Sequence, residues 1–309
     1  MDKRLSRTDL GFSLMFLLML VIAIGAFFYG VKVGGDRVRT EQTEAADALA
    51  QDASAANAPN AYQQQDLVSF YHTVFLSYRE FENEWFAALG KWKADPSADL
   101  SASLKELAKT ANAKYAKIQV DFVSPSSPLL IEAQNNYLKS LKLFSESFST
   151  LAGSADTVAA SELLRQLEDQ AFFTEGRKYA LDGQSAYFAS MLKWGATVNP
   201  DVPGEYEAPN TLNLDQWSAL PLIVKNKVTT DFLSNSRTFA EFLPHDLTAR
   251  IDEFIQSGQA GKMKQTSIGS ISELLVGTDA VRSGDFLDAR SSLYADELLP
   301  QLPFFISER

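Results

Sequence analysis

A run of 22 residues without a single charge constrains this chain more than any other feature of its sequence. The run extends from Leu10 to Val31 and reads LGFSLMFLLMLVIAIGAFFYGV. As a helix rising about 1.5 Å per residue, it would measure roughly 33 Å, close to the roughly 30 Å of a bilayer's hydrocarbon core. A buried helix of a globular domain would normally show a polar face over such a length, and this run shows none. We therefore predict that residues 10–31 form a transmembrane anchor.

The alternative to a retained anchor is a signal peptide that is cleaved. Ala23 to Gly25 forms a small-x-small pattern that follows an apolar stretch of signal-peptide length. The apolar run continues beyond this pattern through Phe27, Phe28 and Tyr29, which is longer than a signal peptide needs. We favour an uncleaved signal-anchor.

The orientation of the anchor does not follow from its flanking charges. Three basic residues lie on each side, and the positive-inside rule counts only these: Lys3, Arg4 and Arg7 before the run, and Lys32, Arg37 and Arg39 after it. Residues 1–9 form a short tail, whereas the rest of the chain is long, acidic and free of cysteine. We therefore expect the bulk of the chain to lie outside the cytoplasm, in the cell envelope.

Charge and cysteine content exclude several classes of protein. The net charge of −11 argues against binding to nucleic acid, which requires a basic surface. The chain contains no cysteine, so it has no disulfide, no thiolate metal site and no catalytic thiol.

After the anchor, the sequence predicts an all-α protein in two parts. Residues 32–61 are rich in Ala, Gln, Asp and Glu and are interpreted as a juxtamembrane spacer. Residues 62–196 carry four long amphipathic patterns, which predict an up-down four-helix bundle. Residues 197–213 contain three prolines and predict a linker, and residues 214–309 predict a second, smaller helical unit.

Two of the bundle's patterns carry specific expectations. The first, within 62–93, has apolar residues at alternating steps of three and four, as on one wide face of a helix. The fourth, 156–196, contains Gly176 and Gly183, which we expect as positions of a kink or break.

The aromatic residues of the first pattern are the candidate ligand site. Between two bundle helices they would line a groove for a small molecule, as ligands bind between helices of bundles. Packing in the core is the alternative interpretation of such a stripe. The residues concerned are Tyr71, Tyr78, Phe81, Trp85 and Trp92.

No motif for catalysis, cofactor binding or metal binding was found. The two histidines, His72 and His245, belong to neither a His-Glu-x-x-His nor a Glu-x-x-His motif, and we interpret both as structural or surface residues. Glu80, Glu82 and Glu84 form an acidic patch, which we interpret as a solvated face. We therefore predict that the protein is not an enzyme.

Two functional hypotheses follow. The first is a membrane-anchored protein that works by binding a protein partner, with a homodimer as a further hypothesis because Ala26 and Gly30 place small side chains on one face of the anchor. The second is a ligand-binding sensory module that signals through a membrane partner, since the bundle resembles in architecture the ectodomains of bacterial receptors.

Overall fold

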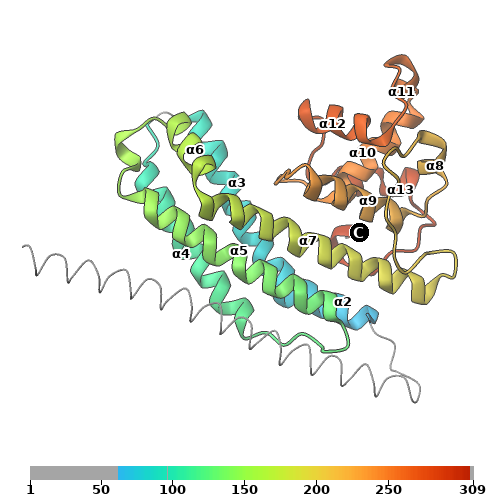
Figure 1. Ribbon diagram of the computed structural model, residues 1–309, viewed down its shortest axis with the longest axis horizontal. Coiled ribbons are helices and arrows are strands. Elements are labelled where there is room, and N and C mark those ends of the chain that lie inside the picture. The colour runs from blue at the N-terminus through green and yellow to red at the C-terminus, as the bar shows by residue number, and fades with distance from the viewer. Residues whose placement is uncertain (1–61, 96, 307–309) are drawn as a thin grey trace, which may run out of the picture. The chain divides into compact units, whose positions relative to one another are not determined.

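The computed structural model describes residues 62–95 and 97–306, and every regular element in these ranges is a helix (Figure 1). The predicted all-α class is confirmed, with a packed helical bundle followed by a C-terminal helical unit. Within the described ranges, no helix is both long and apolar enough to cross a bilayer. The predicted anchor 10–31, with Ala26 and Gly30, and the predicted spacer 32–61 lie outside the described residues.

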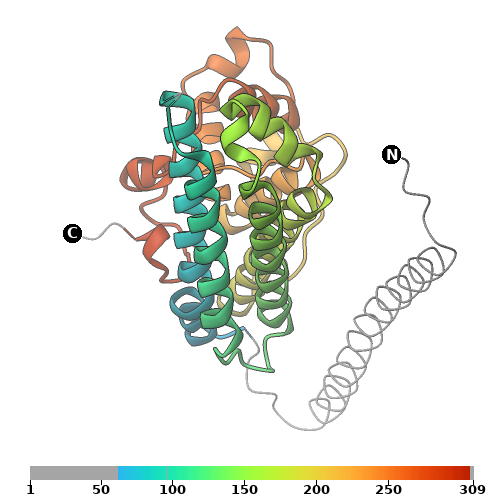
Figure 2. The same cartoon turned by 90° about the vertical axis from the view of Figure 1, so that its left-hand side faces the viewer.

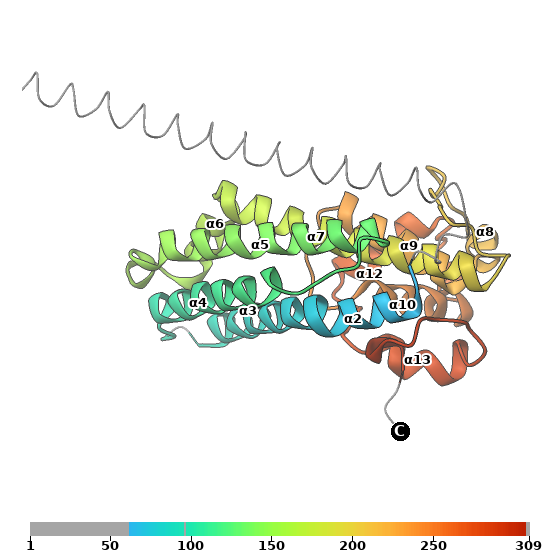
Figure 3. The ribbon, with the colours of Figure 1, turned by 90° about the horizontal axis from the view of Figure 1, so that it is seen from below.

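The bundle is built from long helices that bury the predicted apolar stripes. In chain order these are α2 (Gln64–Phe70), a π-helical turn (Tyr71–Phe75), α3 (Leu76–Ala94), α4 (Leu100–Gln119), α5 (Pro128–Ala152) and α7 (Ala171–Val198). Helix α5 packs along both α4 and α7, and α3 packs on α4. Figure 3 shows these helices running side by side. The burial of their facing stripes stabilises them more than helix propensity does.

Local sequence sets where two of these helices begin. Asp99 caps α4, because its Oδ1 accepts a hydrogen bond of 2.7 Å from the backbone N–H of Ala102. Pro128 occupies the first turn of α5, where its missing N–H leaves no helical hydrogen bond unmade. Residues 120–127 between the two helices form a loop.

The predicted fourth helix is divided in the structure. A 3-10 turn at Ala155–Thr157 leads into α6 (Ala160–Asp169), and α7 begins at Ala171. Between them, Gln170 leaves the helical conformation with a ψ of 128°. The break therefore lies at Gln170, and the expectation of a break at a glycine was wrong.

Gly176 and Gly183 lie inside α7, where they allow close contact with α5. A Cβ built at Gly183 would lie 2.8 Å from the ring of Tyr137, and one at Gly176 would lie 3.4 Å from the ring of Phe144. These glycines serve helix packing, and α7 is continuous through both of them.

The C-terminal unit consists of shorter helices. They are α8 (Leu214–Ser218), α9 (Leu222–Asn235), α10 (Pro244–Gln256), α11 (Gln259–Lys262), α12 (Ile268–Gly277) and α13 (Asp285–Leu293), followed by a 3-10 turn (Pro303–Phe305). Helix α10 contacts α9, α12 and α13. Its Asp252 is 8% exposed and accepts hydrogen bonds from Trp217 Nε1 (2.6 Å), Lys225 Nζ (3.0 Å) and Tyr294 OH (2.7 Å).

The C-terminal unit packs on the bundle. Helix α9 contacts α7, and one cluster of buried apolar side chains includes Phe188 of α7 together with Val224, Phe286 and Phe305. Residues Asn60–Arg309 accordingly form one compact unit. The predicted linker region contains the end of α7 at Val198 and the loop that leads to α8.

Candidate functional site

Most of the aromatic stripe expected to line a ligand groove lies in the core. Four of its members are at most 3% exposed: Tyr78, Phe81, Trp85 and Trp92. Trp85 stacks on Phe148 of α5 with 5.3 Å between ring centroids. Tyr71 is half-buried, and its ring centroid lies 5.6 Å from that of Phe304. This placement matches the core-packing interpretation of the stripe and gives the ligand-groove hypothesis no support.

The three glutamates of α3 each bind a different group. Glu80 forms an ion pair with Lys114 of α4 at 2.5 Å, and Glu84 accepts a hydrogen bond of 2.7 Å from a threonine of α4. Glu82 is 7% exposed and pairs with Arg79 at 3.0 Å. Burial raises the pKa of the Glu82 carboxyl, and the nearby Arg79 opposes this shift. These contacts join neighbouring side chains and helices. No two of the three carboxylates share a partner in them, as a pair of catalytic carboxylates would.

The two histidines lie in different surroundings. His72 is exposed, whereas His245 at the start of α10 is 3% exposed and stacks on Phe304 with 5.0 Å between centroids. Burial, with a contribution from Arg79, lowers the pKa of the His245 imidazole to about 3, so the ring is neutral near pH 7. Among the described residues, no group of three or more His, Asp or Glu side chains is placed to hold a metal ion.

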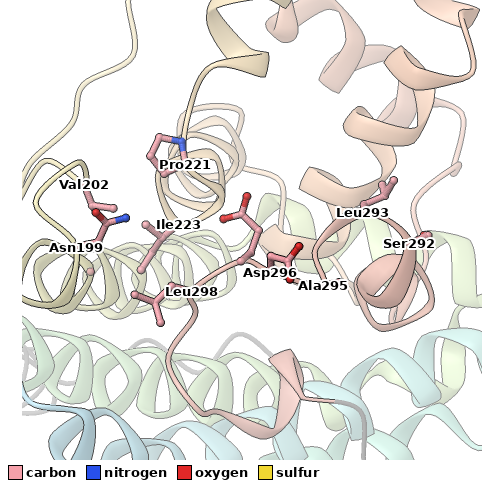
Figure 4. Close-up of a pocket in the computed structure, with 11 residues that line it drawn as sticks. Asn199, Val202, Pro221, Ile223, Ser292, Leu293, Ala295, Asp296 and Leu298 are labelled. Atoms are coloured by element: carbon pink, nitrogen blue, oxygen red, sulfur yellow. The ribbon is translucent and has the colours of Figure 1, made fainter.

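A groove of about 460 Å³ is the best candidate site for a small ligand (Figure 4). It opens where the end of α7 meets the start of α9 and the segment that follows α13. Its volume falls within the range of about 300–1,000 Å³ that is usual for small-molecule sites. The lining residues are Gly195, Asn199, Val202, Pro221, Ile223, Ser292, Leu293, Ala295, Asp296, Glu297 and Leu298.

The chemistry of the groove favours a ligand with a cationic group. Its two charged lining residues, Asp296 and Glu297, are both acidic, and its lining includes neither Lys nor Arg. Ile223 and Leu298 supply apolar surface in the same groove as Asp296 (Figure 4). An amine with a short apolar portion would satisfy both kinds of lining group.

Sequence reasoning missed this groove because it is assembled from three segments that are far apart in the chain. Gly195 packs tightly there, since an added Cβ would lie 3.0 Å from Ile223 Cδ1 and 3.2 Å from Val202 Cγ1. The only signal in the sequence was the proline-rich stretch 197–213, which contributes Asn199 and Val202 to the lining. A scan against protein-family models finds no matching family, and searches of the curated proteins and of the solved structures find no significant match.

Proposed function

We propose that this chain is a single-pass, membrane-anchored protein that acts by binding another protein in the cell envelope, without a catalytic role. The observation that carries the proposal is the uncharged run from Leu10 to Val31, which is long enough to span a bilayer. In this proposal, residues 1–9 form a short tail, residues 10–31 a signal-anchor helix and residues 32–61 a spacer. The helical unit after the spacer is extracytoplasmic.

Two finer features belong to the same proposal. The long helices of residues 62–196 form an up-down four-helix bundle, a topology supported by the short connections from α3 to α4 and from α4 to α5, while α6 lies between α5 and α7. Anchors of two copies associate through the small side chains of Ala26 and Gly30, which would let the helix backbones approach closely.

The proposal is tested by fractionating cells that express the full chain and washing their membranes at alkaline pH. We expect the chain to stay in the membrane pellet, and chemical cross-linking before solubilisation to recover a defined partner. Release by the alkaline wash would contradict the anchor. Retention without any cross-linked partner, across reagents of different reach, would contradict the interaction role.

A second candidate function is favoured by the acidic groove between α7, α9 and the segment after α13. A sensory module would bind a small cationic ligand there and pass the signal to a membrane partner. A ligand that binds only the folded chain raises its thermal stability by mass action. We therefore expect small apolar amines to raise the melting temperature of the full chain in detergent.

Substitutions locate that effect. Asp296→Asn removes one carboxylate of the groove and is expected to reduce the shift, whereas Glu273→Gln on α12 removes an exposed carboxylate elsewhere and serves as the matched control. The sensory function is contradicted if no amine stabilises the chain or if both substitutions weaken the shift equally.

A further inference from the structure

The loop between α4 and α5 exposes two large apolar side chains. Val120 is 81% exposed and Phe122 is 77% exposed, the two highest values among the large hydrophobic residues of the described ranges. Phe122 also lines a small cavity of about 120 Å³ together with Asp66 and Phe70 of α2. Figure 2 shows the loop and the start of α2 at the same end of the bundle. We call Val120 and Phe122 the apolar tip.

Hydrogen bonds hold the backbone of this loop in place. The side-chain amide of Gln134 on α5 donates to the backbone carbonyls of Ile118 (3.0 Å) and Asp121 (2.8 Å). At the other end of the loop, the backbone N–H of Tyr62 donates to Ser127 Oγ at 3.3 Å. The tip is therefore presented by a fixed loop, and the exposure of its side chains is a feature of the fold.

The two stretches of chain that meet at the tip contain few charged residues. The two stretches that meet there, residues 62–70 and 118–130, contain only two charged residues, Asp66 and Asp121, in a chain whose net charge is −11. The carboxylate of Asp66 accepts a hydrogen bond of 3.0 Å from Ser127 Oγ. Exposed charges, among them Lys117 and Glu132, border these stretches, so the apolar contact is confined to the tip. Two exposed apolar side chains of this kind suit the lipid–water interface, where they leave water.

The tip also lies at the end of the bundle where the described chain begins (Figure 2). The described chain begins at Tyr62, beside Ser127 of the same loop, and the 30 residues of the spacer separate it from the anchor. Fully extended, a spacer of that length reaches at most roughly 100 Å, so a bilayer that holds the anchor stays within reach of the tip. Tethering raises the effective concentration of a weak membrane contact and makes it significant.

We propose that Val120 and Phe122 insert into the surface of the bilayer that holds the anchor and so give the helical unit a second membrane contact. This inference rests on the proposed anchoring. The contact fixes which end of the bundle faces the lipid.

Site-specific labelling tests the contact, because the chain has no native cysteine. Ser126→Cys places an environment-sensitive fluorophore on the exposed part of the loop and leaves the tip intact; Met263→Cys places it on an exposed residue of the C-terminal unit. The full chain is reconstituted into phosphatidylcholine vesicles containing lipids with a shallow nitroxide quencher. We expect at least twofold stronger quenching at position 126 than at position 263.

Substitutions then assign the quenching to the tip. Val120→Ser with Phe122→Ser, in the Ser126→Cys chain, should reduce quenching to the level of position 263. Phe172→Ser, which removes a 50% exposed side chain at the start of α7, is the matched control and should leave quenching unchanged. Unaltered circular dichroism of each variant establishes that these exposed substitutions preserve the fold.

Three results would overturn the inference. The first is equal quenching at positions 126 and 263, and the second is quenching at position 126 that survives the double substitution. The third is a fluorescence change that depends on the number of protein chains per vesicle and not on the fraction of quencher lipid, which would indicate contact with a second copy. Flotation of the same vesicles separates the two proposals. A chain that fails to float overturns the anchor and with it the tip contact, whereas a chain that floats with equal quenching overturns the tip contact alone.

Discussion

Two glycines inside long helices differ in what surrounds them. A Cβ at Gly183 would lie 2.8 Å from the buried ring of Tyr137, whereas nothing lies within 4 Å of a Cβ at Gly90 of α3. We expect Gly183→Ala to lower the free energy of unfolding by about 1–3 kcal/mol, because the ring of Tyr137 must shift. Gly90→Ala should raise it by about 0.5–1 kcal/mol, because alanine favours the helix. Urea denaturation of the two variants measures both changes, and changes of equal sign would contradict the packing described for α7.

His245 couples stability to pH. Its pKa is lowered from 6.5 to about 3 by burial, so below pH 6.5 the unfolded chain binds a proton that the folded chain excludes. The contribution of His245 therefore lowers stability as pH falls from about 6.5 toward 3, and it amounts to a loss of about 2 kcal/mol between pH 7 and pH 5. The carboxyls of Glu82 and Asp246 have raised pKa values and contribute with the opposite sign.

A variant isolates the contribution of the histidine from that of the carboxyls. His245→Phe keeps an aromatic ring beside Phe304 and removes the titrating group. We expect the variant to lose about 2 kcal/mol less unfolding free energy than the original chain when the pH falls from 7 to 5, because no histidine is protonated on unfolding. The same pH dependence in both proteins would show that His245 is not buried in its neutral form.

At the scale of an element, the final turn Pro303–Phe305 fastens the C-terminal unit to the bundle. Phe305 is 2% exposed within the cluster of buried side chains shared by the two parts, whereas the next residue, Ile306, is 47% exposed. Phe305→Ala is expected to lower the free energy of unfolding by about 3 kcal/mol through loss of buried surface and cavity formation. Ile306→Ala should change it by no more than about 0.5 kcal/mol. Chemical denaturation distinguishes these values, and equal effects would mean that the turn is not docked as described.

Elements were predictable where a local pattern determines them. The spacing of Tyr78, Phe81 and Trp85 predicted a buried helical face because side chains recur on one side of a helix every 3.6 residues. The break at Gln170 was not predictable in this way, since neither glycine nor proline marks it. Gly183 pointed to a kink, but the space it leaves is filled by Tyr137 of another helix, which sequence spacing does not reveal.

The candidate groove could not be predicted because none of its segments forms it alone. Ile223 and Asp296 line the same groove only because α9 packs on α7 and the segment after α13 lies beside them in the folded chain. The apolar tip shows the same limit in another form. Val120 and Phe122 are apolar residues that directly follow α4, which ends at Gln119, and no spacing pattern reveals that both side chains remain exposed.

At the scale of the whole molecule, the proposed function places the helical unit at a membrane, on its extracytoplasmic side. Neither the three basic residues before the uncharged run nor the three after it decide this side. A cysteine at an exposed position of the helical unit reports the side directly, because the chain has no other thiol.

The most direct measurement combines Met263→Cys with a membrane-impermeant maleimide applied to intact cells that express the full chain. We predict that the chain is labelled without lysis and that the labelled chain stays in the membrane pellet after an alkaline wash. Labelling only after lysis would place the helical unit on the cytoplasmic side, and labelled chain in the wash would show that it is not anchored. Either result would contradict the proposed function.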